Sequence, residues 1–262
     1  MTMESLCYNI RKRGVAHCIS FYTGKLFSTV GTALMNLIGL FYPDGTQTIV
    51  FYNGVNNEYA DNTRALSDYL LENGMGSKYR IVWCVATPRK YDKIKGIVFA
   101  KLNEASGWVS PEALFYCATA KYFMYLYNTG GYHRKYNDKQ IVVNLWHGNG
   151  YKNVKSNQRH KDYVFDYALV SGDLFVDAKA KYWNCDKQKI LPIGYPRYDL
   201  LLRSCNKEEC FFKLAGVELK GRKLILWMPT FLQNAEMGFP ENSILTCYGF
   251  SGIENEQEFQ ML

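Results

Sequence analysis

The stretch Gln140-Ile-Val-Val-Asn-Leu-Trp-His-Gly148 decides the fold. It begins as a nearly continuous apolar run of strand length, which ends at His147 and Gly148. An apolar run without polar alternation is typical of a strand buried on both faces, as in a parallel sheet covered by helices. We therefore expect a β-strand over residues 140–146, with His147 at its carboxyl end.

Apolar runs of similar length recur along the chain and alternate with helical patterns. Asp61-Asn62 opens one helical run, and Ser110-Pro111 is a good helix start because serine caps the first turn and proline fits within it. Strands that alternate with helices indicate βαβ units. The sequence thus predicts an α/β fold, a Rossmann-like doubly wound parallel sheet. The other expected strands cover residues 48–52, 79–85, 96–100, 121–127, 165–170 and 189–193.

Composition and charge narrow the class of protein. The chain has 262 residues, of which 48% are hydrophobic and 21% charged, so it is folded and holds one large domain or two small ones. Lys and Arg number 31 against 24 Asp and Glu, and the formal charge of +7 favours anionic partners. The basic residues are dispersed, and the densest cluster, Arg11-Lys12-Arg13, is too short for a nucleic-acid tail. We expect phosphorylated molecules or an anionic membrane surface as partners, and no nucleic acid.

The cysteines indicate a reducing compartment. The chain has 8 cysteines, scattered without Cys-x-x-Cys spacing, and most of them lie among apolar residues. The polar segment 1–13 has no apolar core behind it and is therefore not a secretory signal. We interpret the cysteines as reduced, buried, cytosolic thiols rather than as a disulfide or metal framework.

Residues 26–42 form an apolar segment at the lower length limit for a membrane span. Apolar residues at helical spacing predict an amphipathic helix here, within an N-terminal segment of residues 1–45. Two interpretations stay open: a helix that packs on the core ahead of the first strand, and an interfacial helix that meets lipid phosphates. A transmembrane helix is the less favoured alternative.

His147 is the main catalytic candidate. In an open α/β sheet ligands bind at the carboxyl ends of the strands, and His147 stands at such an end beside Gly148. Glycine lets a substrate approach the backbone, and an imidazole with a pKa near about 6.5 can take a proton from a hydroxyl group at neutral pH. A lysine, Lys152, follows shortly after. The alternative is a histidine that only forms a hydrogen bond within a turn.

The second candidate run is Gly194-Tyr-Pro-Arg-Tyr-Asp199, where an expected strand ends at glycine and Pro196 fixes the turn. Arg197 can present its planar fork to a phosphate or a carboxylate. A ligand contact and a structural salt bridge are equally open for this arginine. Asp199 is placed to cap a helix over residues 200–203.

The remaining polar residues carry weaker signals. Asn128 ends the fourth expected strand and Asn62 opens a helix, and both positions suit turn or cap residues. His17, His133 and His160 lie in polar, irregular contexts, and no set of His, Cys and Asp has metal-ligand spacing. Gly-x-Gly-x-x-Gly, P-loop and Gly-x-Ser-x-Gly motifs are absent. We therefore expect no metal and no other cofactor.

Taken in order, these runs resemble the CDP-glycerol glycerophosphotransferases, a family that includes teichoic-acid primases and poly(glycerol phosphate) polymerases. The family pattern has Trp-His-Gly with a lysine shortly after, then Gly-x-Pro-Arg-x-Asp, then an apolar strand that ends in Pro-Thr. Here these are Trp146-His-Gly148 with Lys152, residues 194–199, and Leu226-Trp-Met-Pro-Thr-Phe231. The resemblance covers roughly residues 45–232, and three motifs in order are more specific than any one of them.

The resemblance implies the N-terminal domain of a glycosyltransferase-B-like fold and a transferase in bacterial cell-surface polymer synthesis. His147 would deprotonate an acceptor hydroxyl, which attacks the β-phosphorus of a CDP-alcohol such as CDP-glycerol and releases CMP. Positive groups would stabilise the charge on the transferring phosphoryl oxygens, and Lys152 and Arg197 suit that role. Gly148 and Asn128 are expected beside them in the substrate site, and Trp146, Gly194, Pro196 and Asp199 are expected to shape it.

The same resemblance implies a lipid-linked polyol-phosphate acceptor, hence a cytoplasmic protein peripheral at the inner face of the cell membrane. It divides the chain into an acceptor-side domain, residues 46–222, and the start of a donor-binding domain, residues 223–262. Because so little of the second domain is present, we expect an N-terminal fragment or truncated product with impaired transfer. Gly150 replaces the proline usual in relatives. Alternatives are a related enzyme with a nucleotide-sugar donor and a non-catalytic membrane-associated binding domain.

Overall fold

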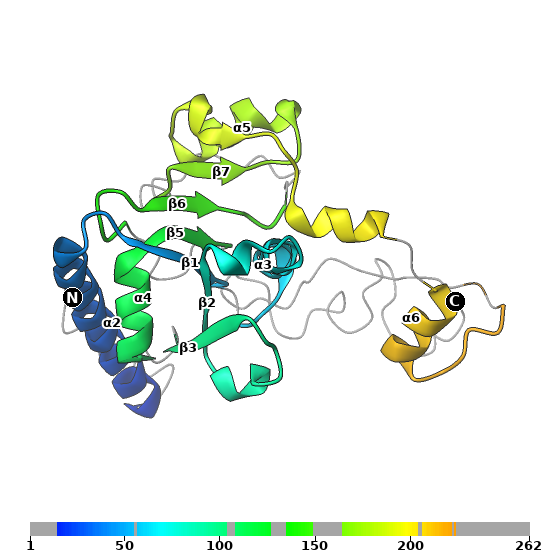
Figure 1. Cartoon of the computed structure of the whole chain (residues 1–262), viewed down its shortest axis with the longest axis horizontal. Helices are drawn as coiled ribbons and strands as arrows, with labels where there is room; N and C mark the ends of the chain where they lie inside the picture. The colour runs from blue at the N-terminus through cyan, green and yellow to red at the C-terminus, as the bar shows by residue number, and fades with distance from the viewer. Residues whose placement is uncertain are drawn as a thin grey trace. The chain divides into compact units, whose positions relative to one another are not determined.

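An eight-stranded sheet organises the first of two units, residues 1–203 (Figure 1). The computed structural model describes residues 15–54, 57–103, 108–126, 135–148, 164–203, 206–221 and 223. The strand order is β4-β3-β2-β1-β5-β6-β7-β8. The strands are β1 (Thr46–Tyr52), β2 (Arg80–Val85), β3 (Ile97–Asn103), β4 (Trp108–Val109), β5 (Ala120–Tyr125), β6 (Ile141–Asn144), β7 (Tyr167–Leu169) and β8 (Ile190–Leu191).

The sheet is parallel apart from its β4 edge, which pairs with β3 in antiparallel orientation. From β1 the chain adds β2 and β3 on one side and β5 to β8 on the other, so the order reverses between β1 and β5. Such a reversal is the topological switch point of a doubly wound fold. The predicted α/β class and parallel sheet are confirmed. The two-residue strand β4 was not expected, because it is too short to give an apolar run.

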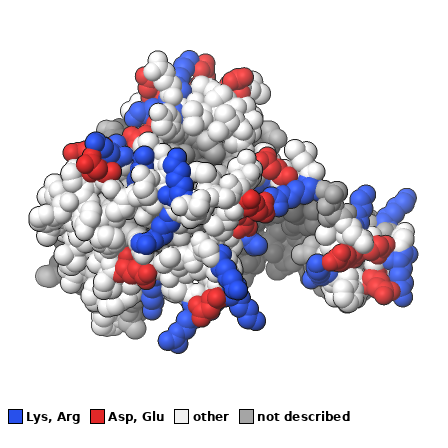
Figure 2. All heavy atoms as spheres, in the orientation of Figure 1, with Lys and Arg blue, Asp and Glu red and all other residues white. Residues whose placement is uncertain are grey.

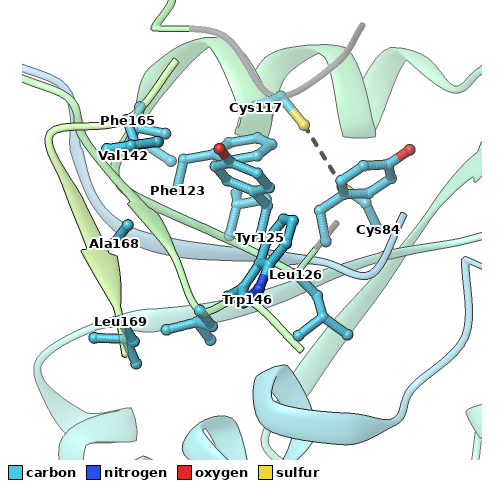
Figure 3. Close-up of a cluster of buried hydrophobic side chains, with 14 of the residues drawn as sticks. Cys84, Cys117, Phe123, Tyr125, Leu126, Val142, Trp146, Phe165, Ala168 and Leu169 are labelled. Carbon is cyan, nitrogen blue, oxygen red and sulfur yellow. Dashed lines mark hydrogen bonds between the residues drawn. The ribbon is translucent and has the colours of Figure 1, made fainter. Parts of the chain in front are cut away.

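Helices cover both faces of the sheet, and alternate residues of β1 show the two faces. Val50 and Tyr52 belong to one buried cluster, while Ile49 and Phe51 belong to another. Such alternation is the pleat of a strand buried on both sides. Figure 3 shows part of the first cluster, in which Trp146 packs. The helices are α2 (Val15–Phe41), α3 (Asp61–Glu72), α4 (Pro111–Thr119), α5 (Val176–Trp183) and α6 (Lys207–Ala215), with short 3-10 helices η1 (Met75–Ser77), η2 (Pro88–Tyr91), η4 (Asp173–Phe175), η5 (Lys187–Lys189) and η6 (Pro196–Leu202).

The predicted start of α4 is confirmed, because the Ser110 hydroxyl accepts a hydrogen bond from the Ala113 amide over 3.2 Å. The start of η6 corrects a prediction. This 3-10 helix begins at Pro196, with Tyr195 as its N-cap residue, so Asp199 lies inside it. Asp199 is therefore not the cap of a helix over residues 200–203. Proline at the first position sets the start, since its fixed φ suits that place and its missing N–H is not needed there.

Helix α2 packs on α4 and β4 through a narrow face on which Met35 and Gly39 are buried. A Cβ atom on Gly39 would stand 1.9 Å from the main-chain oxygen of Tyr136, so only glycine allows this approach. The rest of the helix exposes large apolar side chains, among them Leu40 at 75% and Phe41 at 76%. The predicted helix is confirmed, and it both contacts the core and leaves an apolar face uncovered. Its segment Tyr22–Phe41 is long and apolar enough to cross a membrane.

Four of the cysteines are free thiols in the structure, namely Cys84, Cys117, Cys185 and Cys210. Cys84 and Cys117 are buried, with their sulfur atoms 3.5 Å apart (Figure 3). Their hydrogen bond and their burial raise the pKa of Cys117, which keeps this thiol protonated. Cys185 is half-buried and Cys210 is exposed, so the prediction that the cysteines are buried is confirmed for Cys84 and Cys117 and is wrong for Cys210.

The second unit covers residues 204–262, of which the structure describes 206–221 and 223. Its helix α6 is capped at the amino end by Asn206, whose side-chain oxygen accepts hydrogen bonds from the amides of Glu208 and Glu209. Left-handed Gly216 caps the carboxyl end. The motif at residues 226–231 lies outside the described residues. The predicted domain boundaries at 45/46 and 222/223 stay a prediction.

Candidate functional site

The loop Leu145–Gly148 leaves the carboxyl end of β6 and carries the candidate histidine. β6 pairs with β5, which pairs with β1, so the loop lies near the switch point of the sheet. Residues 141–144 form the strand, whereas residues 145–148 follow it as a loop. His147 therefore lies where ligands bind in folds of this kind. The predicted strand ends two residues earlier than expected, at Asn144 rather than Trp146.

The backbone of this loop is held in an uncommon conformation. Trp146 has φ +48° and Gly148 has φ +141°, and a positive φ is costly for tryptophan because its Cβ meets the carbonyl oxygen. Two side chains oppose this strain. The Trp146 amide donates to Oδ1 of the buried Asn144 over 2.9 Å, and its carbonyl oxygen accepts from Nδ2 of Asn62 over 2.7 Å. Strain of this kind persists where surrounding contacts fix it, often at functional sites.

Asn62 connects the histidine loop to η6. It lies in the first turn of α3, is fully buried, and accepts a hydrogen bond from the Arg197 amide over 3.1 Å at its Oδ1. Together with the bond to the Trp146 carbonyl, this uses both ends of its side-chain amide. The sequence suggested a turn or cap residue here, but the N-cap of α3 is Ala60. Asn62 is thus a site residue that local sequence reasoning missed, because its partners are distant in the chain.

Arg197 uses both arms of its guanidinium within the protein. Its Nη1 lies 2.7 Å from Oδ1 of Asp61, and its Nη2 donates to the main-chain oxygen of His147 over 2.6 Å. Asp61 itself has φ +63°, a second left-handed residue in this network. Of the two alternatives left open by the sequence, the structure shows the salt bridge. The motif at residues 194–199 therefore reaches the histidine through the backbone.

A cluster of aromatic side chains, with Trp146 at its centre, packs next to His147. The Trp146 ring is nearly buried and packs edge-on against Trp183, with ring centres 5.2 Å apart. Lys179 of α5 places its ammonium 4.8 Å from the centre of the Trp146 ring and 4.9 Å from that of Tyr182. Nothing in the local sequence marked Lys179, since it occurs in an ordinary helical run. Only the three-dimensional structure could identify Lys179, because its ammonium lies over the rings of two tryptophans.

The electrostatic surroundings keep His147 neutral. Burial, and then the positive charge of Lys179, lower its pKa from 6.5 to about 4, while Asp61 raises it in part and Arg197 lowers it further. A neutral imidazole at pH 7 has a free lone pair and can accept a proton. His147 is half-buried, so part of it remains accessible.

The structure brings together Trp146, His147, Gly148 and Arg197, as predicted from the sequence. Gly194 has φ +88°, a left-handed turn that favours glycine, and Pro196 starts η6. Gly194, Pro196 and Asp199 line a cavity of about 250 Å³ between α3 and η6. Asn128 and Lys152 lie outside the described residues, so their substrate-binding roles stay predictions. Within the described ranges no three His, Cys, Asp or Glu side chains converge as a metal site would require.

Comparisons with known proteins identify the family of the chain. Residues 34–257 match the family described as CDP-Glycerol:Poly(glycerophosphate) glycerophosphotransferase. The chain is 24% identical over 217 residues to a teichoic acid poly(glycerol phosphate) polymerase of Staphylococcus epidermidis, covering 71% of this chain and 27% of that protein. It is 25% identical over 236 residues to the protein of the same name from Bacillus spizizenii, covering 80% of this chain and 56% of the relative.

A solved structure of the wall teichoic acid polymerase TagF shares the fold, with a TM-score of 0.52 at 19% identity over 76% of this chain and 52% of that one. A variant of that polymerase soaked with CDPG superposes equally well, with a TM-score of 0.52. The chain thus spans about a quarter and about half of the two curated relatives, and about half of the solved polymerase. Since the family match covers most of the residues, the chain belongs to the CDP-glycerol:poly(glycerophosphate) glycerophosphotransferase family.

Proposed function

We propose that this protein takes part in the transfer of glycerol phosphate, or a similar polyol phosphate, from a CDP-alcohol to a hydroxyl group of a lipid-linked or polymer acceptor. The product would be a teichoic-acid-like cell-surface polymer. One observation carries the proposal: a neutral, half-buried histidine stands at the carboxyl end of a central strand, on a backbone that Asn62 and Arg197 hold. Family membership and the names of the curated relatives support the same chemistry.

In the proposed reaction His147 is the general base. Its unprotonated ring nitrogen takes the proton of the acceptor hydroxyl as the oxygen attacks the β-phosphorus of the CDP-alcohol. The bond from that phosphorus to the bridging oxygen breaks, CMP leaves with the electron pair, and a phosphodiester forms. A pKa of about 4 means that His147 is ready to accept a proton at any pH of the cytoplasm, although it is a weak base until an anion binds nearby.

The residues around His147 divide between positioning and binding. Arg197 is occupied by Asp61 and the His147 carbonyl, so we assign it to positioning, and to phosphate binding only through its influence on the loop. Gly148 leaves room beside the histidine, since a Cβ there would first meet Arg197 Nη2 at 3.6 Å. Lys152 and Asn128 are the proposed further contacts to phosphate.

The test is acceptor-dependent CMP release by the purified protein from CDP-glycerol, with a synthetic lipid-linked glycerol phosphate as acceptor. CDP-ribitol and nucleotide sugars serve as competing donors. We expect CMP release, however slow, with a CDP-alcohol and none without acceptor. Transfer from a nucleotide sugar alone would replace the proposal by the sugar-transferase alternative, and binding without turnover of any donor would favour a non-catalytic binding domain.

We further propose that α2 lies on the anionic inner face of the cell membrane. Its outward face carries Leu26, Leu37, Leu40 and Phe41, all of them about half exposed or more. An uncovered row of this size is unusual for a soluble surface and suits the boundary between headgroups and acyl chains. In Figure 2 the charged side chains of both signs are interspersed over the face shown, so the net positive charge adds a diffuse attraction.

Flotation with liposomes that contain phosphatidylglycerol tests this placement. The variant Leu40→Gln with Phe41→Gln should leave the floating fraction, and alkaline carbonate should release the wild-type protein, as expected of a peripheral helix. Retention of the double variant on liposomes would contradict it, and resistance to carbonate would instead indicate a helix that spans the membrane.

A further inference from the structure

We propose that Lys179 binds a phosphate oxygen of the substrate beside His147. The proposal rests on the proposed function. It adds Lys179 as the residue that binds the substrate phosphate on the side of the site next to β7 and β8. Lys179 belongs to none of the motifs that relate this chain to its family.

Its position is fixed by three aromatic rings. The ammonium of Lys179 lies 4.8 Å from the centre of the Trp146 ring, 4.9 Å from that of Tyr182 and 5.4 Å from that of Trp183. Trp146 directly precedes His147, and the two rings are 4.2 Å apart. The lysine and the histidine therefore both lie against the same indole, and the positive charge of Lys179 lowers the pKa of His147.

Its charge lacks a counterion among the described residues. No Asp or Glu oxygen there comes within the 4.0 Å of a salt bridge, and Asp177, two residues earlier on α5, pairs instead with Lys187 at 2.7 Å. Burial also lowers the pKa of Lys179. A lysine that only packs its stem on aromatic rings would extend its ammonium into water. This ammonium is instead drawn back over the rings, where it loses solvation that their faces offset only in part.

The comparison with Arg197 shows why the anion belongs at Lys179. Both cations act on His147, but Arg197 is already neutralised by Asp61 at 2.7 Å. Within the described part of the chain, Lys179 is therefore the cation of this site whose charge is not neutralised by a carboxylate. A phosphate placed between Lys179 and His147 would pair the ammonium and cancel part of the field that keeps the imidazole a weak base.

The ligand class is a phosphate or phosphodiester oxygen, which both the CDP-alcohol donor and a polyol-phosphate acceptor carry. A compact ammonium with rotatable donors suits a tetrahedral anion approached from one side. Binding would then lift the pKa of His147 toward neutrality, so that the base becomes stronger only when substrate is present.

Binding to the purified chain tests the inference without any need for turnover. Inorganic phosphate, sn-glycerol 3-phosphate and CDP-glycerol are titrated by isothermal calorimetry. The intrinsic tryptophan fluorescence, to which Trp146 and Trp183 contribute, provides a second signal. The variants are Lys179→Met, which keeps an apolar stem on the rings, Lys179→Gln in case the first does not fold, and Lys179→Arg, which restores a cation. Lys139→Met is the matched control, because Lys139 is exposed and pairs with Asp44 at the amino end of β6.

We expect Lys179→Met or Lys179→Gln to raise the Kd for phosphate about tenfold, Lys179→Arg to recover most of the affinity, and Lys139→Met to leave it unchanged. NMR of the His147 ring should show a pKa that rises on phosphate addition in the wild type and stays constant in Lys179→Met. A larger loss for glycerol 3-phosphate than for CDP-glycerol assigns the site to the acceptor, and the reverse assigns it to the donor. Unchanged phosphate affinity in folded Lys179→Met overturns the inference. Failure of CMP release with intact Lys179-dependent binding would instead count against the proposed function alone.

Discussion

The guanidinium of Arg197 donates a hydrogen bond of 2.6 Å to the main-chain oxygen of His147. The two residues are 50 positions apart in the chain, and the bond joins the loop after β6 to the 3-10 helix η6. Arg197 thereby orients the histidine through its backbone, while Asp61 holds the arginine in place. Two of the three sequence motifs that carry the family resemblance thus form one structural unit.

Replacing Arg197 by Gln should weaken this unit. The variant loses the ion pair to Asp61 and the bond to the His147 carbonyl, so we expect transfer to fall roughly tenfold to a hundredfold, mainly in kcat, with about 1–2 kcal/mol of stability lost. A double-mutant cycle with Asp61→Asn isolates the pair, whose partly exposed side chains limit the coupling to about 1 kcal/mol. A rise in KM with unchanged kcat would show that Arg197 contacts substrate rather than positions the histidine.

Asn62→Ala should be among the more destabilising substitutions at the site. It removes the donor to the Trp146 carbonyl and the acceptor for the Arg197 amide, and it leaves both groups buried. The expected loss is about 2–3 kcal/mol in the free energy of unfolding, measured by urea denaturation. Asn73→Ala on the same helix is the control, because Asn73 is exposed and bonds only within the last turn. Equal losses in the two variants would show that Asn62 serves the helix and not the loop.

The lowered pKa of His147 predicts a pH dependence of stability. Above pH 6.5 the histidine is neutral in both the folded and the unfolded chain, whereas between pH 6.5 and about 4 the unfolded chain binds the proton more readily. The free energy of unfolding should therefore fall as pH drops through this window, by roughly 1–2 kcal/mol given the partly exposed ring. Chemical denaturation of the wild type and His147→Gln from pH 7.5 to 4 isolates this contribution. Parallel curves would show that the pKa of His147 is ordinary.

The contact of α2 with the domain predicts a strong effect at one glycine. Gly39→Ala would place a Cβ 1.9 Å from the Tyr136 carbonyl oxygen, which belongs to the backbone and cannot rotate away. The helix must shift, at a cost of about 2–3 kcal/mol. Gly172→Ala is the control, because its added Cβ meets nothing within 4 Å. Similar thermal midpoints for the two variants would show that α2 does not pack as described.

The sequence predicted the features that depend on neighbouring residues. The apolar runs gave the parallel strands, and Ser110 with Pro111 gave the start of α4. His147 was placed at a strand end from its local run alone. The same reasoning wrongly predicted that Asp199 caps a helix. A 3-10 helix is too short to show an apolar period, so the sequence did not reveal that η6 begins at Pro196.

Features that depend on distant contacts were not predictable in this way. Asn62 looks like any polar residue in a first helical turn, and only its contacts to residues 146 and 197 reveal its role. Lys179 is an ordinary helical lysine until α5 packs on β8 and brings it over Trp146. For Arg197 the sequence allowed a phosphate or a carboxylate partner, and only the position of Asp61 at the start of α3 reveals the carboxylate that it contacts.

The central claim is that His147 is the base of the transfer reaction, and chemical rescue tests it most directly. Acceptor-dependent CMP release from CDP-glycerol is measured for the wild type and for His147→Ala, with and without added imidazole, after circular dichroism has shown that the variant is folded. The account predicts a loss of at least about a hundredfold in kcat for His147→Ala and partial recovery with imidazole. Transfer by folded His147→Ala at the wild-type rate would contradict it.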